Sequence, residues 1–431
     1  MASRKRAIRR SQGQRKALPV ERAATTGLPY VTAHLPGTGG AIKVQAADFC
    51  VTEIAAYRPC GHGDHVFFEI EKRGRTTVDV VAEISRILRR VPRDVGFAGM
   101  KDARAVTRQT LSVEGVAPER IADLELRGVR ILRVARHNAK LKLGHLRGNR
   151  FSLKIRGCRA GALARAEAIV GELEQRGVPN YFGPQRFGNR GDNHVAGWAI
   201  LRGDLRRALD VLLGHPSGTD RPNIRQARRL YTQGHFAEAA RAWPAAFQWQ
   251  QRACRALAQA EGNVVRAFAA VDRSAKTFLI QAAQSDLFNR VVAARVDTLD
   301  RLQLGDVALR HANGACFVVE EPAVDQPRCT ALEISPTGPL FGARLTPAAG
   351  DVGALETRLL QEAGVDGNRF ESLGPLAPKG QRRPLRVPLT EVSVAGGKDR
   401  FGPFLRLAFV LPPGSYATAV TREVTKQPVE G

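Results

Sequence analysis

The segment GFAGMKDARAVTRQTLSV, residues 96–113, places a single acidic side chain between two apolar runs. The first run is short and the second alternates polar and apolar side chains from residue 106 onward, so both predict β-strands with a loop between them. Asp102 lies in this loop beside Lys101 and Arg104. Most loop aspartates support turns, whereas neighbouring cations favour the charged carboxylate that a general base or nucleophile requires. A turn residue and a catalytic carboxylate are therefore the two interpretations of Asp102.

The sequence before this loop predicts strands followed by a helix. Residues 41–54 and 64–74 are rich in Val, Ile and Phe, as is typical of strands. Residues 76–90 carry an apolar stripe at helical spacing, with Thr76 or Thr77 placed to cap the helix and arginines at its end. The helix predicted over residues 162–176 is followed by Gly177, which fits its end, and by Pro179, which cannot continue it.

The middle of the chain has a different character. Residues 204–295 predict a series of helices. Asn313 and Gly314 lie between apolar runs, a pattern that predicts a β-hairpin, and residues 385–412 predict a closing pair of strands. Because 431 residues exceed one typical core, the mid-chain region is predicted to be an inserted or second domain.

The charge balance indicates a polyanionic partner. Lysine and arginine number 66 against 41 acidic residues, a formal net charge of +25. Nucleic acid is favoured over a membrane, because no segment has the roughly 20 apolar residues of a spanning helix. Residues 1–16 are basic and lack the apolar region of a signal peptide, which predicts a disordered arm that adds phosphate contacts. The six scattered cysteines contain no CxxC pair and predict reduced thiols in a cytoplasmic protein.

Two further stretches combine aromatic and basic side chains. Residues 143–157 interleave arginines and lysines with Phe151, which suits either a platform for an extruded base or an ordinary strand with Phe151 in the core. Residues 180–193 include Phe182 and Arg186 in a glycine-containing loop that is apolar for a surface segment, and we predict that it lines an RNA groove.

Other chemistries are poorly supported. His62 and His65 flank an aspartate but have no third ligand at regular spacing, so a turn is favoured over a metal site. The glycines at 37–40 lack the spacing of a phosphate-binding loop. A nucleic-acid hydrolase would need paired carboxylates or metal ligands at short spacing, and the sequence offers no convincing set.

Taken in order, eight segments resemble the TruD family of tRNA pseudouridine synthases. They are IKVQAADFCVTE, GHGDHVFFEIEKRGRTT, GFAGMKDARAVTRQ, LGHLRGNRF, NYFGPQRFG, FLIQAAQSDLFNR, PTGPLFG and LPPGSYATAVTRE. The resemblance covers nearly the whole chain after residue 30. It implies an isomerase that converts uridine to pseudouridine in a tRNA, classically uridine 13 in bacteria, without a cofactor or metal.

The resemblance also implies a site. Its catalytic aspartate corresponds to Asp102, its base-stacking phenylalanine and adjacent asparagine to Phe151 and Asn149, and its basic residue before the DFxVxE element to Lys43. We expect Lys43 or a nearby arginine to pair with Asp102. We add Lys101, Arg104, Arg186 and Phe182 to the predicted RNA-binding residues.

The implied fold is α+β, a catalytic domain with a mixed, largely antiparallel sheet flanked by helices and an inserted α/β TRUD domain. The predicted limits are a basic arm at 1–29, the catalytic domain at 30–178 and 380–425, the insertion at 179–379 and a tail at 426–431. A monomer is expected, since no heptad pattern is present. The competing function is a basic RNA-binding or RNA-chaperone protein without catalysis.

Overall fold

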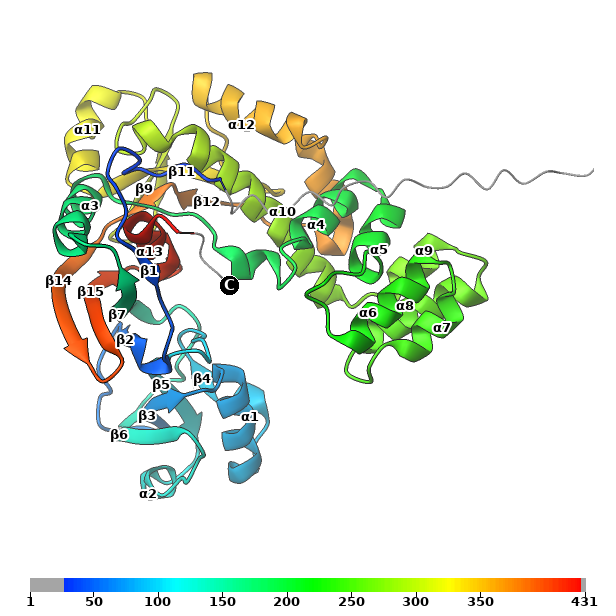
Figure 1. Cartoon of the computed structure of the whole chain (residues 1–431), viewed down its shortest axis with the longest axis horizontal. Helices are drawn as coiled ribbons and strands as arrows, with labels where there is room; N and C mark the ends of the chain where they lie inside the picture. The colour runs from blue at the N-terminus through cyan, green and yellow to red at the C-terminus, as the bar shows by residue number, and fades with distance from the viewer. Residues whose placement is uncertain (1–26, 428–431) are drawn as a thin grey trace, which may run out of the picture.

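The computed structural model describes residues 27–427. The predicted basic arm and the tail therefore lie largely outside the described residues. Within this range a large sheet and its helices make up one side of the molecule, and a group of helices extends from it on the other side (Figure 1).

The large sheet has nine strands, and its main path runs in the order β14-β15-β7-β2-β5-β3-β6. Every strand pair in it is antiparallel except β2 with β5, which is parallel. The predicted mixed, largely antiparallel sheet is therefore confirmed. The strands are β1 (Gly39–Ala41), β2 (Phe49–Ala55), β3 (His65–Arg73), β4 (Gly96–Phe97), β5 (Val106–Glu114), β6 (Val129–His137), β7 (Leu146–Cys158), β14 (Thr390–Asp399) and β15 (Gly402–Leu411).

Helix α1 (Thr77–Leu88) forms where the sequence predicts it. The Thr76 side chain accepts a hydrogen bond from the Asp79 main chain, and the Asp79 carboxylate accepts one from the Thr76 main chain, so the two residues form a reciprocal cap at the start of the helix. Its apolar stripe packs on β3 and β5, where Phe68, Ile70 and Leu111 are buried. The short helix α2 (Pro118–Ala122) precedes β6.

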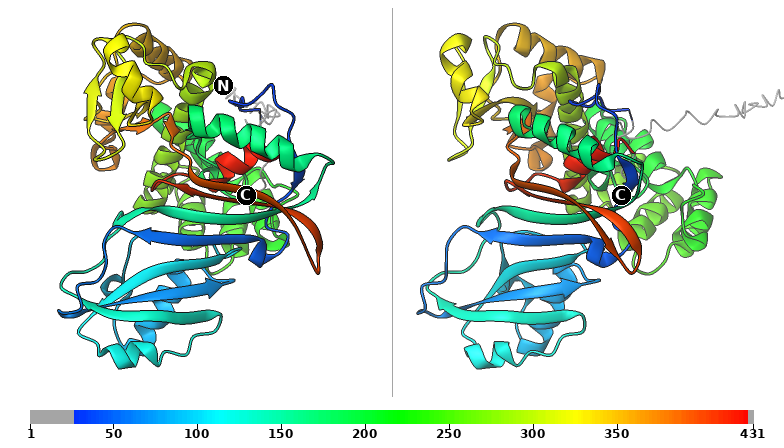
Figure 2. Two further views of the ribbon diagram at one scale, coloured as in Figure 1. Left: turned by 90° about the vertical axis from the view of Figure 1, so that its left-hand side faces the viewer. Right: turned by 60° about the vertical axis from the view of Figure 1, so that its left-hand side comes forward.

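Two further helices cover the other end of the sheet. Helix α3 (Ala162–Arg176) ends at Gly177, whose φ is +80°, as its predicted stop requires. Helix α13 (Ala417–Thr425) lies beside it next to β7, β14 and β15 (Figure 2). Their apolar side chains share one core with Leu153, Ile155 and Leu407 of the strands.

The extending part consists of helices and confirms the predicted helical series. It comprises α4 (Asn193–Arg202), α5 (Leu205–Leu213), α6 (Pro222–Thr232), α7 (Phe236–Ala242), α8 (Gln248–Gln259), α9 (Val264–Ala269) and α10 (Arg273–Ala294). The 22-residue helix α10 belongs to two cores, since Leu279 and Leu287 pack among these helices and Phe288 and Val292 pack in the core of the large sheet.

Helices α4 and α10 approach closely at Gly197. A Cβ atom at this position would lie 2.0 Å from the main-chain oxygen of Leu279. Gly197→Ala should therefore force the helices apart and lower the free energy of unfolding by about 1–3 kcal/mol. Gly171→Ala on α3, where a Cβ meets nothing within 4 Å, should instead stabilise by about 0.5–1 kcal/mol. Denaturant unfolding measures both, and equal midpoints for the two variants would contradict the close approach.

A separate small sheet has the order β10-β9-β11-β12. Its strands are β9 (Val307–Arg310), β10 (Cys316–Val318), β11 (Ile334–Leu340) and β12 (Gln381–Pro384), accompanied by α11 (Pro322–Thr330) and α12 (Gly350–Glu362). Strands β9 and β10 form the hairpin that Asn313 and Gly314 predict, with Gly314 at a φ of +74°. This prediction is confirmed.

The chain leaves the part that contains the large sheet and returns to it at paired strands. Strand β8 (Val178–Pro179) pairs with β13 (Arg386–Val387). An insertion requires its two ends to lie close together, so this pairing suits the predicted division near residues 179 and 379, which stays a prediction.

Candidate active site

The loop that carries Asp102 emerges from a split in the large sheet. Strands β2 and β5 pair in parallel over residues 50–52 and 106–108. Farther along β5, strand β4 replaces β2 as the neighbour on this edge and pairs Gly96 with Ser112 and Phe97 with Leu111. The chain therefore leaves β4 at the point where β2 and β5 diverge, and it crosses this gap before entering β5.

Several hydrogen bonds fix the loop on the sheet. The Lys101 main chain donates to Thr77 Oγ1 at 2.9 Å, at the start of α1. Thr77 Oγ1 donates in turn to Gln109 on β5 at 2.8 Å. The Lys101 ammonium pairs with Glu53 at 2.9 Å, and both side chains are buried. The loop is thus anchored to a helix and to two strands.

The Asp102 carboxylate is half exposed and is held through one oxygen. Lys43 Nζ lies 3.3 Å from Oδ2, and Gln185 Nε2 lies 3.5 Å from the same atom. Within residues 27–427 no hydrogen bond reaches Oδ1. The expected pairing of Lys43 with Asp102 is therefore present, and one carboxylate oxygen stays available for another group.

Lys43 is itself positioned by two features. Its φ is +58°, an uncommon conformation for a side chain of this size. Its ammonium lies over the Phe49 ring, 4.6 Å from the ring centre. The backbone conformation and the aromatic contact together direct the Lys43 ammonium toward Asp102.

A cavity of about 420 Å³ opens beside Asp102, a size typical of small-molecule sites. Its wall combines Lys43, β2, the loop that carries Asp102, β7, the segment Gly183–Gln185 and the segment that leads into α13. The lining residues are Lys43, Phe49, Val51, Ala98, Gly99, Met100, Lys101, Asp102, Gly144, Leu146, Asn149, Phe151, Gly183, Pro184, Gln185, Pro413, Gly414, Ser415, Tyr416, Ala417 and Thr418.

Phe151 and Asn149 lie on the β7 wall of this cavity. Phe151 is 7% exposed, stacks on Phe409 at 5.3 Å and meets Phe49 edge-on at 6.3 Å. It is thus both a core residue and part of the cavity wall, so the two interpretations from the sequence do not exclude each other. Asn149 Oδ1 is buried and has no hydrogen-bond partner among the described residues. Buried acceptors are usually satisfied, and this one borders the cavity.

Comparison with known proteins agrees with this geometry. Residues 25–424 match the family described as tRNA pseudouridine synthase D (TruD). The chain belongs to the TruD family. This membership confirms the predicted enzyme class, a pseudouridine synthase, which is an isomerase.

Individual TruD relatives match over nearly their whole length. A tRNA pseudouridine synthase D of Geobacter metallireducens is 49% identical over 397 residues, which cover 92% of this chain and 97% of that protein. One from Anaeromyxobacter dehalogenans is 39% identical over 94% of this chain and 98% of that protein. The crystal structure of a putative TruD from Methanosarcina mazei superposes with a TM-score of 0.78, with 26% identity, 94% of this chain and 97% of that chain covered.

Not every predicted site residue of this TruD protein lies at the cavity. Lys101 lines it, but its ammonium turns to Glu53. Arg104 is exposed and is not part of the wall. Phe182 and Arg186 lie behind the wall, where the Arg186 guanidinium stacks 5.4 Å from the Phe182 ring centre and its Nε donates to Ser285.

These residues support the wall through Arg383, which sequence reasoning missed. Its guanidinium lies 4.2 Å from the Phe182 ring centre and donates to Asn180 Oδ1 at 2.6 Å and to the Gly414 carbonyl at 3.0 Å. Burial lowers the pKa of Arg383 to about 10, so the group stays charged at neutral pH. Arg383 thereby ties the cavity wall before α13 to the segment that follows β8.

Gln185 and Glu53 were also missed as site residues. Gln185 lies inside the aromatic loop at residues 180–193 that the sequence singles out, yet only the fold brings it to Asp102. The strand predicted over residues 41–54 is correct only in part, because a 3-10 helix occupies Ala46–Asp48 and β2 begins at Phe49. Glu53 lies within β2, and its role as the partner of Lys101 depends on the divergence of β2 from β5.

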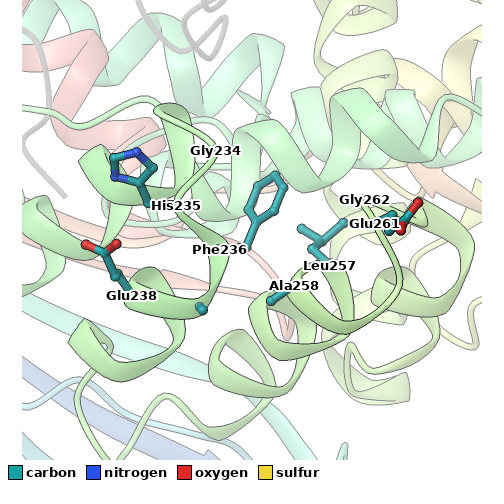
Figure 3. Close-up of a pocket in the computed structure, with 9 residues that line it drawn as sticks. Gly234, His235, Phe236, Glu238, Leu257, Ala258, Glu261 and Gly262 are labelled. Carbon is teal, nitrogen blue, oxygen red and sulfur yellow. The ribbon is translucent and has the colours of Figure 1, made fainter.

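Other features offer no comparable chemistry. A cavity of about 370 Å³ lies between α7 and α8, where His235 and Glu238 stand on one side and Glu261 on the other (Figure 3). Across residues 27–427, no cluster of three His, Cys, Asp or Glu is arranged to hold a metal ion. None of the helices in the same range is long and apolar enough to cross a membrane. All six cysteines lie in this range and are free, and burial raises the pKa of the Cys50 and Cys158 thiols, which makes them weak nucleophiles.

Proposed function

We propose that this protein isomerises a uridine of tRNA, uridine 13, to pseudouridine and that Asp102 is its catalytic residue. The observation that carries the proposal is the Asp102 carboxylate at the wall of the cavity, with Oδ2 held by Lys43 and Gln185 and Oδ1 unbonded within the described residues. The names of the relatives supply the tRNA substrate, and the resemblance to the bacterial family supplies position 13.

The reaction needs one carboxylate and no change in oxidation state. The bond between N1 and C1′ breaks, the uracil turns, a bond forms between C5 and C1′, and C5 loses its proton. Asp102 can begin this by attacking C1′ or by removing the proton at C2′ to give a glycal. Both routes require a carboxylate oxygen that is free to approach the ribose, and the two donors on Oδ2 leave Oδ1 for this purpose.

The cavity suits a uracil base that has been extruded from the base stack of the RNA. Extruding a uridine from folded RNA costs a few kcal/mol, which stacking and hydrogen bonds in the pocket offset. Phe151 is fixed from behind by Phe409 and offers an apolar surface, while Asn149 Oδ1 offers an acceptor. Uracil carries one ring N–H that can donate to such an acceptor.

Asn149→Ala should lower kcat/KM about tenfold, the equivalent of one lost hydrogen bond. The loss should appear in the steady-state rate of pseudouridine formation on a tRNA transcript. Ser152→Ala is a matched control, because Ser152 is an exposed polar residue of the same strand. Equal kcat/KM for wild type and Asn149→Ala would rule out this contact with the base.

The experiment that tests the function is pseudouridine mapping by carbodiimide labelling and primer extension. The protein is incubated with two transcripts of one tRNA, one with uridine at position 13 and one with cytidine there. A single new stop at position 13, absent from the second transcript, is the expected result. A stop elsewhere would overturn the choice of uridine, and tight binding of both RNAs without any new stop would favour the non-catalytic RNA-binding protein.

A further inference from the structure

Lys72 occupies a position that strand alternation assigns to the apolar core. It follows Phe68 and Ile70 on the same face of β3, and both are fully buried beneath α1. Lys72 itself is 1% exposed. Burying an ammonium is costly unless its charge and hydrogen bonds are met. Within residues 27–427 the acceptors of this ammonium are main-chain carbonyls and not a carboxylate.

The three hydrogens of the ammonium have three acceptors. Lys72 Nζ donates to the carbonyl oxygens of Arg75 at 2.6 Å, Lys101 at 3.1 Å and Asp102 at 3.0 Å. Two of these carbonyls belong to the loop that carries the catalytic carboxylate. Lys72 does not line the cavity, so it reaches the reaction only through this main chain.

We propose that Lys72 is a positioning residue, whose ammonium fixes the main chain at Lys101 and Asp102 and so holds the Asp102 carboxylate in place for reaction. This role rests on the proposed function of Asp102. We expect it to affect the rate of the chemical step and not the affinity for tRNA, because the buried Lys72 side chain cannot contact the RNA itself.

The protonation state of Lys72 matters to this role. Burial lowers its pKa to about 8, with Lys101 lowering it further and Asp102 and Asp79 of α1 opposing the shift. A neutral amine has two hydrogens for three carbonyls, so one anchor is lost above this pH. Because the pKa is lower in the folded than in the unfolded chain, deprotonation of Lys72 increases the free energy of unfolding as the pH rises. Loss of activity near pH 8 would therefore not come from unfolding driven by this group.

The test compares Lys72→Met with Lys426→Met in the full chain. Lys426 is a matched control, since its ammonium donates to the carbonyl and hydroxyl of Thr32 at 2.7 and 2.6 Å and to Glu423 at 3.2 Å, away from the cavity. For Lys72→Met we expect a single-turnover rate about a hundredfold below wild type, with the Kd for tRNA changed by less than about twofold. Lys426→Met should keep the wild-type rate.

The pH profile supplies the second measurement. The wild-type rate should fall above about pH 8 while tRNA binding and circular dichroism stay constant, and Lys72→Met should lack this step. If the wild type is active and Lys72→Met matches it in rate and profile, the positioning role is wrong. If Lys72→Met does not fold, a wild-type rate that stays constant through pH 8 overturns the proposal. If the wild type makes no pseudouridine at all, the proposed function fails first, and the positioning role fails with it.

Discussion

Asp102→Asn is expected to abolish pseudouridine formation and to leave tRNA binding almost unchanged. Asparagine has the same shape and can still accept hydrogen bonds from Lys43 and Gln185. It lacks the negative charge that attack at C1′ or proton removal at C2′ requires. We expect turnover to fall by at least about 10⁴-fold, measured as single-turnover pseudouridine formation, and the Kd for tRNA to change by less than about twofold.

Asp123→Asn is the matched control for this substitution. Asp123 is an exposed aspartate of the same sheet domain, at the end of α2 and outside the cavity. It should behave as wild type in both measurements. Retained turnover in Asp102→Asn would show that the carboxylate is not catalytic. Loss of both turnover and tRNA binding would assign Asp102 a structural role.

Glu356→Ala should have the largest effect on stability. Glu356 on α12 accepts two hydrogen bonds from the Arg382 guanidinium of β12, at 2.7 and 2.9 Å, and both side chains are buried. Burial raises the pKa of Glu356 despite this partner, which indicates how costly the buried charge is. Removing Glu356 leaves Arg382 buried without its counter-ion and should lower the free energy of unfolding by about 3–5 kcal/mol.

Glu362→Ala on the same helix provides the comparison. Glu362 pairs with Arg358 at 3.8 Å, and both side chains are exposed. Such surface pairs contribute about 0–1 kcal/mol, so the unfolding midpoint should hardly move. Denaturant unfolding of both variants measures the difference, and a loss below about 1 kcal/mol for Glu356→Ala would mean that water reaches Arg382 once its partner is gone.

Patterns in the sequence predicted those elements that depend on interactions between residues close together in the chain. The capped helix at α1, the hairpin at Asn313 and Gly314, and the loop between β4 and β5 all depend on neighbouring residues, and the structure confirms each of them. The same holds for the closing strands β14 and β15.

Contacts between distant segments could not be predicted in this way. Lys101 lies next to Asp102 in the sequence, yet its ammonium pairs with Glu53 because β2 and β5 diverge at that point. Gln185 reaches Asp102 from 83 positions away. Strand alternation places Lys72 on the apolar face of β3, but the carbonyl groups that accept hydrogen bonds from its ammonium become visible only with the Asp102 loop in place.

Helix α10 has a consequence for the choice of RNA. This single helix contributes Leu287 to the core of the extending helices and Phe288 to the core of the large sheet. The two parts therefore cannot move apart without disrupting one of these cores. We therefore expect the protein to select RNA by its folded shape. The distance between the extending helices and the cavity is fixed. We expect an RNA whose folded shape matches this distance to present its uridine to Asp102, and a single strand of the same local sequence not to do so.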